Sequence, residues 1–278
     1  LASMPTIVGR VLAELDSPRG NARTIGRIIE NDPPLTARML GVANSALFAP
    51  IDRISTAERA VSRLGVGEVR NIVLATSLLE VFRHSEGRLD VADLYVHAVT
   101  SGVVICELAR RTHHPGVQKL GSADTFFTLG LLYDLGLFAL NQALPEVLWD
   151  CIQLAEANVE SLPEIEQKIM GYDHSAVGAL LLQRWRLTPW EIEIARWHHK
   201  PDRAPADARA IAQLAHLTGV GVHSLNVAPQ MNALVRHCSL QSIGELGMSA
   251  EMLADFIQGA SVFAERARAL VEVIYSQG

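Results

Sequence analysis

Apolar residues recur along most of this chain at a spacing of three or four positions, which is the period of an amphipathic α-helix. The first such stripe, at Val8, Val11 and Leu12, follows Pro5, a residue that suits the first turn of a helix. Strict alternation of apolar and polar residues, as in a half-buried strand, occurs only in the short segment 222–227. The pattern therefore predicts an all-α protein in which helices pack against helices.

Start and stop signals divide this pattern into many helices. Asp32-Pro33 is a strong start signal, because Asp accepts hydrogen bonds from free N–H groups and Pro suits the first helical position. Gly65 is expected to end a helix that a Ser55–Glu58 capping box begins. Further starts are expected at Asn21, at Asp173 and at two more capping boxes, Ser161–Glu164 and Thr188–Glu191. Long helices are expected over about 91–111 and 124–143.

The weakest point of the first half of the chain is the polar segment 84–88, which contains Gly87. At about 150 residues per domain, 278 residues favour one or two domains. We therefore expect an N-terminal helical bundle over residues 1–88, a second helical bundle over 89–220 and a helical extension over 221–278.

The composition is that of a globular protein, since 49% of the residues are hydrophobic and 19% are charged, which excludes a disordered chain. The net charge of -6 and the lack of a basic stripe argue against nucleic acid as a partner. The most apolar stretch, 126–140, is too short to cross a bilayer and contains Asp134, so no membrane partner is expected. Three scattered cysteines and no evident signal peptide favour a cytoplasmic protein with reduced thiols.

The chain has no Walker A loop, GxGxxG turn, HExxH or GxSxG motif, so its candidate chemistry is in its histidines. Asp134 lies in a very apolar helix, where a carboxylate is costly unless it is paired or binds a metal ion. Imidazole and carboxylate together suit Zn, Mn, Fe or Ni. The alternatives are core histidines and an Asp134 bonded to a backbone amide or an arginine. The candidate metal ligands are His97, Asp134, His174, His198, His199 and His216.

His198 and His199 are adjacent in the sequence, which limits how both could bind one metal ion. Neighbouring residues on a helix are rotated by about 100°, so the two rings cannot share one helix face. We expect that they serve two metal ions, or that one is a ligand and the other supports it.

Several segments of the chain carry motifs of one known family. The most specific are Asn44-Ser45-Ala46 and an LG-x-x-x-VRN segment that ends in Val69-Arg70-Asn71. The segments are DPPLTARMLGVANSALF (32–48), ISTAERAVSRLGVGEVRNIVLA (54–75), the helix of His97, LGLLYDLG (129–136) and EIARWHHKP (193–201). Together they resemble the HDOD domain, an HD-related output domain of bacterial signalling proteins, over about residues 1–215.

HDOD domains are related to the HD-domain metal phosphohydrolases, which hold one or two metal ions that activate water against a phosphoester. The resemblance implies that the first histidine of such a site corresponds to His97. It implies that the aspartate of the adjacent His-Asp pair corresponds to Asp134. The later histidines of the site correspond to His174, His198 and His199.

Three positions depart from the catalytic pattern. Tyr133 stands where the His-Asp pair has its histidine, and His216 stands where a late aspartate is expected. Leu137 occupies the position of a lysine found in the cyclic-di-GMP-cleaving HD-GYP relatives. Phenol is a poor ligand because its reference pKa is about 10. We therefore expect a degraded catalytic site that holds at most one divalent metal ion.

The resemblance implies a non-catalytic output or scaffold domain that binds signalling proteins or a small ligand and responds to an upstream receiver or sensory domain. One alternative is a metal-dependent phosphohydrolase acting on a nucleotide or cyclic dinucleotide. Another is a sensor that binds a nucleotide second messenger without cleaving it. A homodimer through the amphipathic segment 259–278 is weighed against packing of that segment on its own domain. The candidate ligand- or partner-binding residues are Asn44, Ser45, Arg70 and Asn71, with fastening of helix ends by hydrogen bonds as the alternative.

Overall fold

The computed structural model describes residues 3–45, 48, 50, 52–121, 123–227 and 240–276. These residues form helices joined by turns, and no strand occurs among them, which confirms the predicted all-α class. The one strand candidate, 222–227, is not a strand, because these residues complete a long buried helix and the turn after it. Cys238 and the motif residue Ala46 lie outside the described residues.

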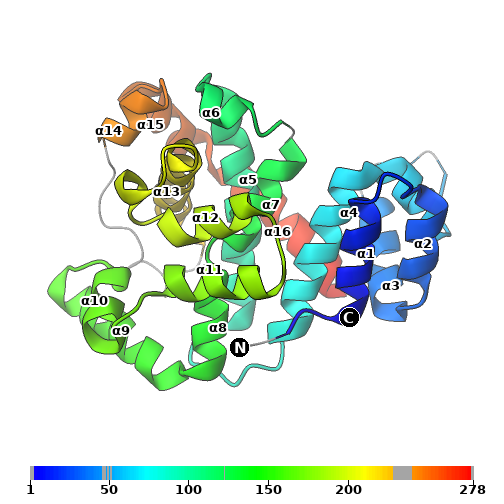
Figure 1. The fold of residues 1–278 in the computed structure, drawn as a ribbon, viewed down its shortest axis with the longest axis horizontal. Helices are drawn as coiled ribbons and strands as arrows, with labels where there is room; N and C mark the ends of the chain where they lie inside the picture. Colours follow the sequence, from blue (N-terminus) through cyan, green and yellow to red (C-terminus); the bar gives the residue numbers. More distant parts are fainter. Residues whose placement is uncertain are drawn as a thin grey trace. The chain divides into compact units, whose positions relative to one another are not determined.

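The chain divides into two compact units (Figure 1). The smaller unit comprises Ser3–Val81 together with the C-terminal residues from Arg268 onward, and the larger unit comprises Phe82–Ala267. The predicted domain boundaries at 88/89 and 220/221 stay a prediction. The helices of the smaller unit are α1 (Thr6–Leu15), α2 (Ala22–Glu30), α3 (Pro33–Ala43) and most of α4 (Ala57–Phe82).

The larger unit contains the remaining helices. These are α5 (Val91–Arg111), α6 (Pro115–Gln118), α7 (Ala123–Leu132), α8 (Leu135–Ala143), α9 (Pro145–Asn158), α10 (Leu162–Met170), α11 (His174–Arg184), α12 (Pro189–Trp197), η1 (Pro201–Arg203), α13 (Arg209–Ser224), α14 (Leu240–Glu245), α15 (Ala250–Gly259) and the first part of α16 (Ser261–Ser276).

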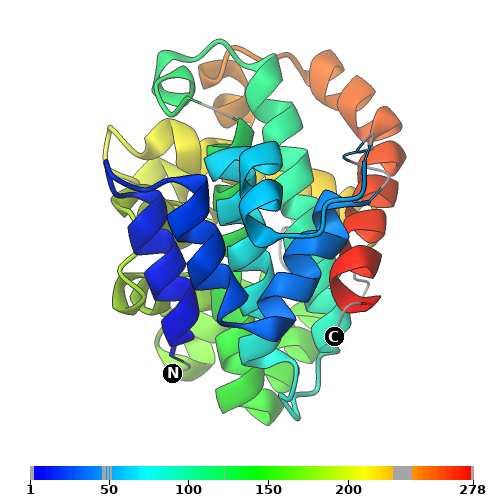
Figure 2. The same cartoon turned by 90° about the vertical axis from the view of Figure 1, so that its right-hand side faces the viewer.

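In the smaller unit, α1, α2 and α3 follow one another as neighbouring helices (Figure 2). Their starts match the expected signals, since Asn21 caps α2 and the Asp32 carboxylate accepts a bond from the N–H of Leu35 in α3. The expected Ser55 cap is wrong: the hydroxyl of Thr56 accepts the N–H of Arg59 at the start of α4. The later capping boxes at Ser161 and Thr188 and the cap at Asp173 are confirmed.

Two positions show how the sequence shapes long helical stretches. Gly65 has φ of 82° inside α4, so the helix is interrupted where glycine was expected to end it. The stretch predicted as one helix over 124–143 is two helices, because the chain leaves helical geometry at Tyr133 and Asp134 between α7 and α8. This break lets Asp134 lie at a helix terminus within an apolar environment.

Close helix crossings bring the elements around Asp134 together. The Cα of Gly130 on α7 faces α5 so closely that an added Cβ would lie 2.5 Å from the carbonyl oxygen of Ser101. A Cβ on Gly136 of α8 would lie 1.9 Å from the carbonyl oxygen of His174 on α11. Only residues without a side chain allow these two approaches, which place the end of α7 and the start of α8 beside α5 and α11.

Two stretches, Val91–Arg111 and Ala123–Ala143, are long and apolar enough to cross a membrane by length and composition. The stretch 126–140, which was expected to be too short, lies within the second of these longer apolar stretches. However, 61% and 78% of their most apolar windows is buried inside the structure, as in core helices.

Replacing Gly130 by Ala should force α5 and α7 apart. We expect the free energy of unfolding to fall by about 3 kcal/mol, the upper part of the usual range for overpacking. Urea denaturation followed by circular dichroism measures this change. Gly259→Ala is the matched control, because nothing lies within 4 Å of its added Cβ, and it should be neutral or stabilising. Equal effects of the two substitutions would contradict the close crossing.

Candidate metal centre

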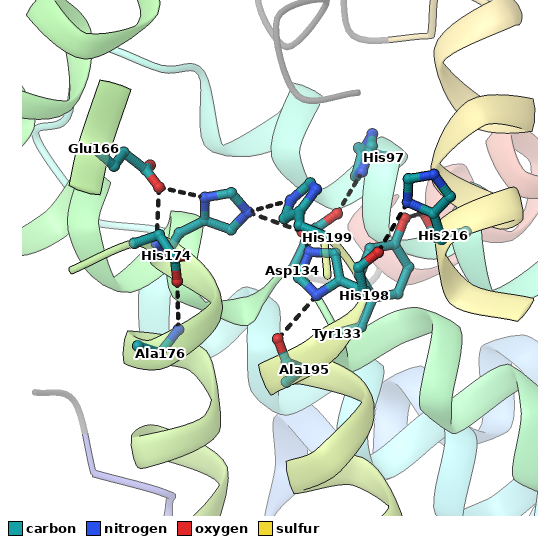
Figure 3. Close-up of polar contacts among 12 residues, drawn as sticks. His97, Tyr133, Asp134, Glu166, His174, Ala176, Ala195, His198, His199 and His216 are labelled. Carbon is teal, nitrogen blue, oxygen red and sulfur yellow. Dashed lines mark hydrogen bonds and ion pairs between the residues drawn. The ribbon is translucent and has the colours of Figure 1, made fainter. Parts of the chain in front are cut away.

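Three helical segments of the larger unit direct histidines toward Asp134, which lies between α7 and α8 (Figure 3). Asp134 follows α7, His97 lies on α5, and His174 is the first residue of α11. His198 and His199 follow the last residue of α12. One ligand atom from each of Asp134, His174, His198 and His199 lies within 4.8 Å of the others.

The carboxylate of Asp134 contacts three imidazoles. Its Oδ2 lies 3.0 Å from Nε2 of His97, and its Oδ1 lies 3.1 Å from Nε2 of His198 and 3.6 Å from Nε2 of His174. The side chain makes no capping bond to α8. The expected alternative partners, a backbone amide or an arginine, are thus replaced by histidines.

The three imidazoles around Asp134 determine its charge. Burial by itself would raise the pKa of its carboxyl, but the positive charge of protonated His198 and the ring N–H groups that protonated His174 and His198, and His97, turn toward the carboxylate outweigh burial. The pKa of Asp134 is held well below its usual value. Asp134 is therefore a carboxylate at neutral pH, the form that binds a metal ion.

His174 is completely buried and lies between two carboxylates. Its Nδ1 is 2.7 Å from Oε2 of Glu166 on α10, and its Nε2 is 2.9 Å from Nε2 of His199. Burial alone would lower the pKa of His174, but the charges and hydrogen bonds of Glu166 and Asp134 raise it to about 10. The site therefore favours positive charge at this imidazole. Glu166 was not among the candidates from the sequence.

His198 and His199 both reach the site, although neighbouring residues of one helix could not share a face. They can because α12 ends at Trp197, so His199 lies in the following turn. The two ring centroids are 4.0 Å apart. Burial and the nearby His198 and His174 hold the pKa of His199 well below its usual value. His199 is therefore a neutral imidazole, the form that binds metal ions.

His216 of α13 does not join this group of donors. Its Nδ1 lies 3.0 Å from the carbonyl oxygen of His198, to which it donates. His198 in turn donates from Nδ1 to the carbonyl oxygen of Ala195 at 2.9 Å. The bond to Ala195 orients the ring of His198 so that its Nε2 faces Asp134, and the bond from His216 holds the backbone of His198. The predicted role of His216 as a ligand stays a prediction.

The chemistry of the donors fits a cation. Nδ1 of His174 faces a carboxylate and Nδ1 of His198 faces a carbonyl oxygen, so each Nδ1 carries a hydrogen, and in the neutral, metal-binding form of each ring Nε2 presents a lone pair. His198 Nε2 and Asp134 Oδ1 are buried and have no hydrogen-bond partner among the described residues. Two such acceptors 3.1 Å apart repel unless a proton or metal ion lies at them. The 4.8 Å span is about twice a metal–ligand distance of ~2.0–2.2 Å, which suits one ion.

Tyr133 is buried beside this site. Its hydroxyl lies 3.2 Å from the hydroxyl of Ser101 on α5, and its ring centroid is 4.8 Å from that of His198. Burial first, and then the charge of Asp134, raise the pKa of the Tyr133 phenol well above its usual value. The neutral phenol packs beside the donors and is a poor metal ligand.

The predicted binding residues Asn44, Ser45, Arg70 and Asn71 lie in the smaller unit. The side chain of Asn44 makes three bonds of 2.8 Å to backbone groups, one to Leu40 and two to Ile54. Ser45 donates to the carbonyl of Val42, Arg70 pairs with Asp16, and Asn71 is buried. The bonds of Asn44 and Ser45 fit the alternative that they fasten the end of α3, and ligand or partner binding at the four residues stays a prediction.

Comparisons with known proteins agree with the fold and the motifs. The profile of the HDOD domain family matches residues 1–201, most of the range over which the sequence shows the resemblance. An uncharacterised protein of Treponema pallidum (strain Nichols) is 26% identical over 228 residues, which are 81% of this chain and 43% of the relative. The chain thus spans less than half the length of that curated relative.

Two solved structures are similar to this one. An HDOD domain protein of unknown function from Geobacter sulfurreducens has a TM-score of 0.75 at 21% identity, covering 99% of this chain and 93% of that chain. A protein provisionally named a signal transduction protein, from Marinobacter aquaeolei VT8, has a TM-score of 0.76 at 20% identity, covering 99% and 60%. At these identities the likeness shows the fold.

Substitutions should show that His198 and His97 differ in their effect on metal binding. His198 is a candidate metal ligand, whereas His97 contacts Oδ2 of Asp134. We expect His198→Ala to lose stoichiometric Zn²⁺. We expect His97→Ala to keep one equivalent with an affinity about 10- to 100-fold lower, as for partners of metal ligands. Equilibrium competition with a chelating dye measures both, and exposed His84→Ala is the control. Complete loss in His97→Ala would make His97 a ligand.

Asn44→Ala should destabilise the smaller unit, because it leaves backbone groups of Leu40 and Ile54 without their partner. We expect a loss of about 1–3 kcal/mol in the free energy of unfolding, measured by urea denaturation. Asn158→Ala is the matched control, since its single bond to Leu154 is exposed and should contribute little. An Asn44→Ala protein of unchanged stability would contradict the fastening role.

Proposed function

Since the chain belongs to the HDOD family, we propose that it is a non-catalytic output domain of bacterial signal transduction that binds a protein partner or a small ligand. It is an HD-like domain of the signalling type. The finer proposal is that the remnant of the HD metal site organises the fold around Asp134 and performs no hydrolysis.

One observation carries this proposal: ligand atoms of four residues lie within 4.8 Å of one another, close enough to bind one ion together. Structural zinc sites are closed by four protein ligands, whereas catalytic sites keep a position open for water or substrate. Asp134, His174 and His198 are buried, and His199 is partly buried. With all four bound, a tetrahedral ion has no place for a phosphoester oxygen or an activated water.

The residues that would hold the ion are Asp134, His174, His198 and His199. A bound divalent ion would supply a fixed positive charge and Lewis acidity at this point. The chain itself does the orienting: His97 donates to Asp134, and His216 donates to the carbonyl oxygen of His198. Zn, Fe, Mn and Ni all bind imidazole and carboxylate donors, and Zn²⁺ is the ion whose tetrahedral sphere these four donors would complete.

Two positions weaken the alternative of a phosphohydrolase. The neutral phenol of Tyr133 is a poor substitute for the histidine that a bridging His-Asp pair would supply to a second ion. Leu137 is buried and apolar, so it gives no charge to a phosphate. A two-metal clamp on a phosphoester therefore lacks both a ligand and a cationic partner.

The remaining parts of the proposal concern setting and partners. We place the domain in the cytoplasm, where the thiols of Cys106 and Cys151 stay reduced. Its partners would be signalling proteins, with an upstream receiver or sensory domain as the source of the signal. A homodimer and a nucleotide second messenger are further partners to test, whereas nucleic acid and membranes are not expected partners.

Elemental analysis followed by a phosphodiesterase assay tests the proposal. The purified protein should contain about one divalent ion per chain and should not hydrolyse cyclic dinucleotides or bis(p-nitrophenyl) phosphate above a metal-only blank. Asp134→Ala should lose the ion, and His84→Ala should keep it. Turnover by the wild type that Asp134→Ala abolishes would establish the hydrolase instead.

Titration calorimetry with cyclic dinucleotides tests the sensor alternative. The preferred proposal expects no saturable heat from them. Saturable binding that is lost when His198 and His199 are replaced, and kept in His84→Ala, would favour a nucleotide sensor at this site.

A further inference from the structure

We propose that Glu166 is a positioning residue of the metal site. Its carboxylate fixes the ring of His174 with Nε2 toward Asp134 and His199, and its charge adjusts the site to a divalent ion. The inference rests on the proposed function, because it concerns the ion that these residues would hold. Neither the family motifs nor the sequence pattern pointed to Glu166.

Among the described residues, the hydrogen bonds of the Glu166 side chain go to His174. The Glu166 side chain is completely buried, and its Oε2 accepts two bonds from His174. One comes from the backbone N–H at 2.8 Å and the other from ring Nδ1 at 2.7 Å. Since His174 is the first residue of α11, its N–H is one of the free groups at a helix start, where negative charge is favourable. The carboxylate therefore anchors both the backbone and the ring of His174.

The two bonds decide which nitrogen of His174 faces the site. A carboxylate only accepts, so Nδ1 must carry a hydrogen. In the neutral ring Nε2 then has the lone pair, and Nε2 is the atom 3.6 Å from Asp134 Oδ1 and 2.9 Å from His199 Nε2. A carboxylate behind a metal-binding histidine fixes the tautomer and makes the ligand more basic. Glu166 fills this role for His174.

The negative charge of Glu166 also contributes to the total charge around the proposed ion. With neutral imidazoles, the donors carry the single negative charge of Asp134, and Glu166 adds a second one through His174. The total of two negative charges matches a divalent ion. Oε1 of Glu166 is buried without a hydrogen-bond partner among the described residues, so no donor there screens the carboxylate. The nearby charges of Lys200 and Asp173 neutralise each other through their own bond, so they add no net charge to the site.

Glu166→Gln separates charge from shape, because the amide oxygen can still accept both bonds. We expect Glu166→Gln to raise the dissociation constant for Zn²⁺ by about 10- to 100-fold with one equivalent still bound. Glu164→Gln is the matched control: it removes one charge from the same helix, and glutamine can still serve in the capping box with Ser161. An unchanged constant in Glu166→Gln, or an equal rise in Glu164→Gln, would overturn the charge role.

A second measurement needs no metal. In ¹⁵N-labelled metal-free protein, the Nδ1–H of His174 should give a slowly exchanging signal in the wild type and in Glu166→Gln, and this signal should be lost in Glu166→Ala. Its absence from the wild type, or its persistence in Glu166→Ala, would overturn the ring-fixing role. A wild type that binds no Zn²⁺ would overturn the proposed function. The Nδ1–H signal would still report whether Glu166 bonds to the ring of His174, because it needs no metal.

Discussion

The larger unit depends on the burial of one carboxylate. Asp134 is placed in an apolar interior, where an unpaired charge costs several kcal/mol, and three imidazoles surround it. Each imidazole comes from a different helical segment, so satisfying Asp134 requires α5, α11 and the end of α12 to meet at the break between α7 and α8. The polar centre and the helix packing are therefore one arrangement, and loss of either should disturb the other.

Helix ends and glycines make this arrangement geometrically feasible. Asp134, His174 and His198 all lie at helix termini, where a side chain can leave the 100° rotation of a helix and aim at a common point. Gly130 and Gly136 let α7 and α8 approach α5 and α11 at backbone distance. The cluster of Asp134 and its histidines is therefore compact, and the hydroxyl of Tyr133 lies beside that of Ser101.

Much of this could be predicted from the sequence, because helical periodicity and caps at Asn21, Asp32 and Thr188 are local signals. Asp134 was recognisable as a carboxylate on an apolar stripe. Glu166 lacks this signal: it follows Leu162 by four positions, but Glu164, Gln167 and Lys168 make its helix polar, so a buried carboxylate there could not be recognised. The break at Tyr133 could not be predicted, because Leu, Gly and Phe on both sides continue a helical pattern and only tertiary contacts to Asp134 favour the break.

The central claim is that the remnant HD site holds one ion and leaves no place for a second. Anomalous X-ray scattering from crystals grown with Zn²⁺ or Mn²⁺ tests it most directly. The account predicts a single peak bonded to Asp134, His174, His198 and His199, with His97 on the carboxylate oxygen and the Tyr133 hydroxyl on Ser101. Two peaks about 3.5–4 Å apart, bridged by Asp134 with His97 as a ligand, would contradict it.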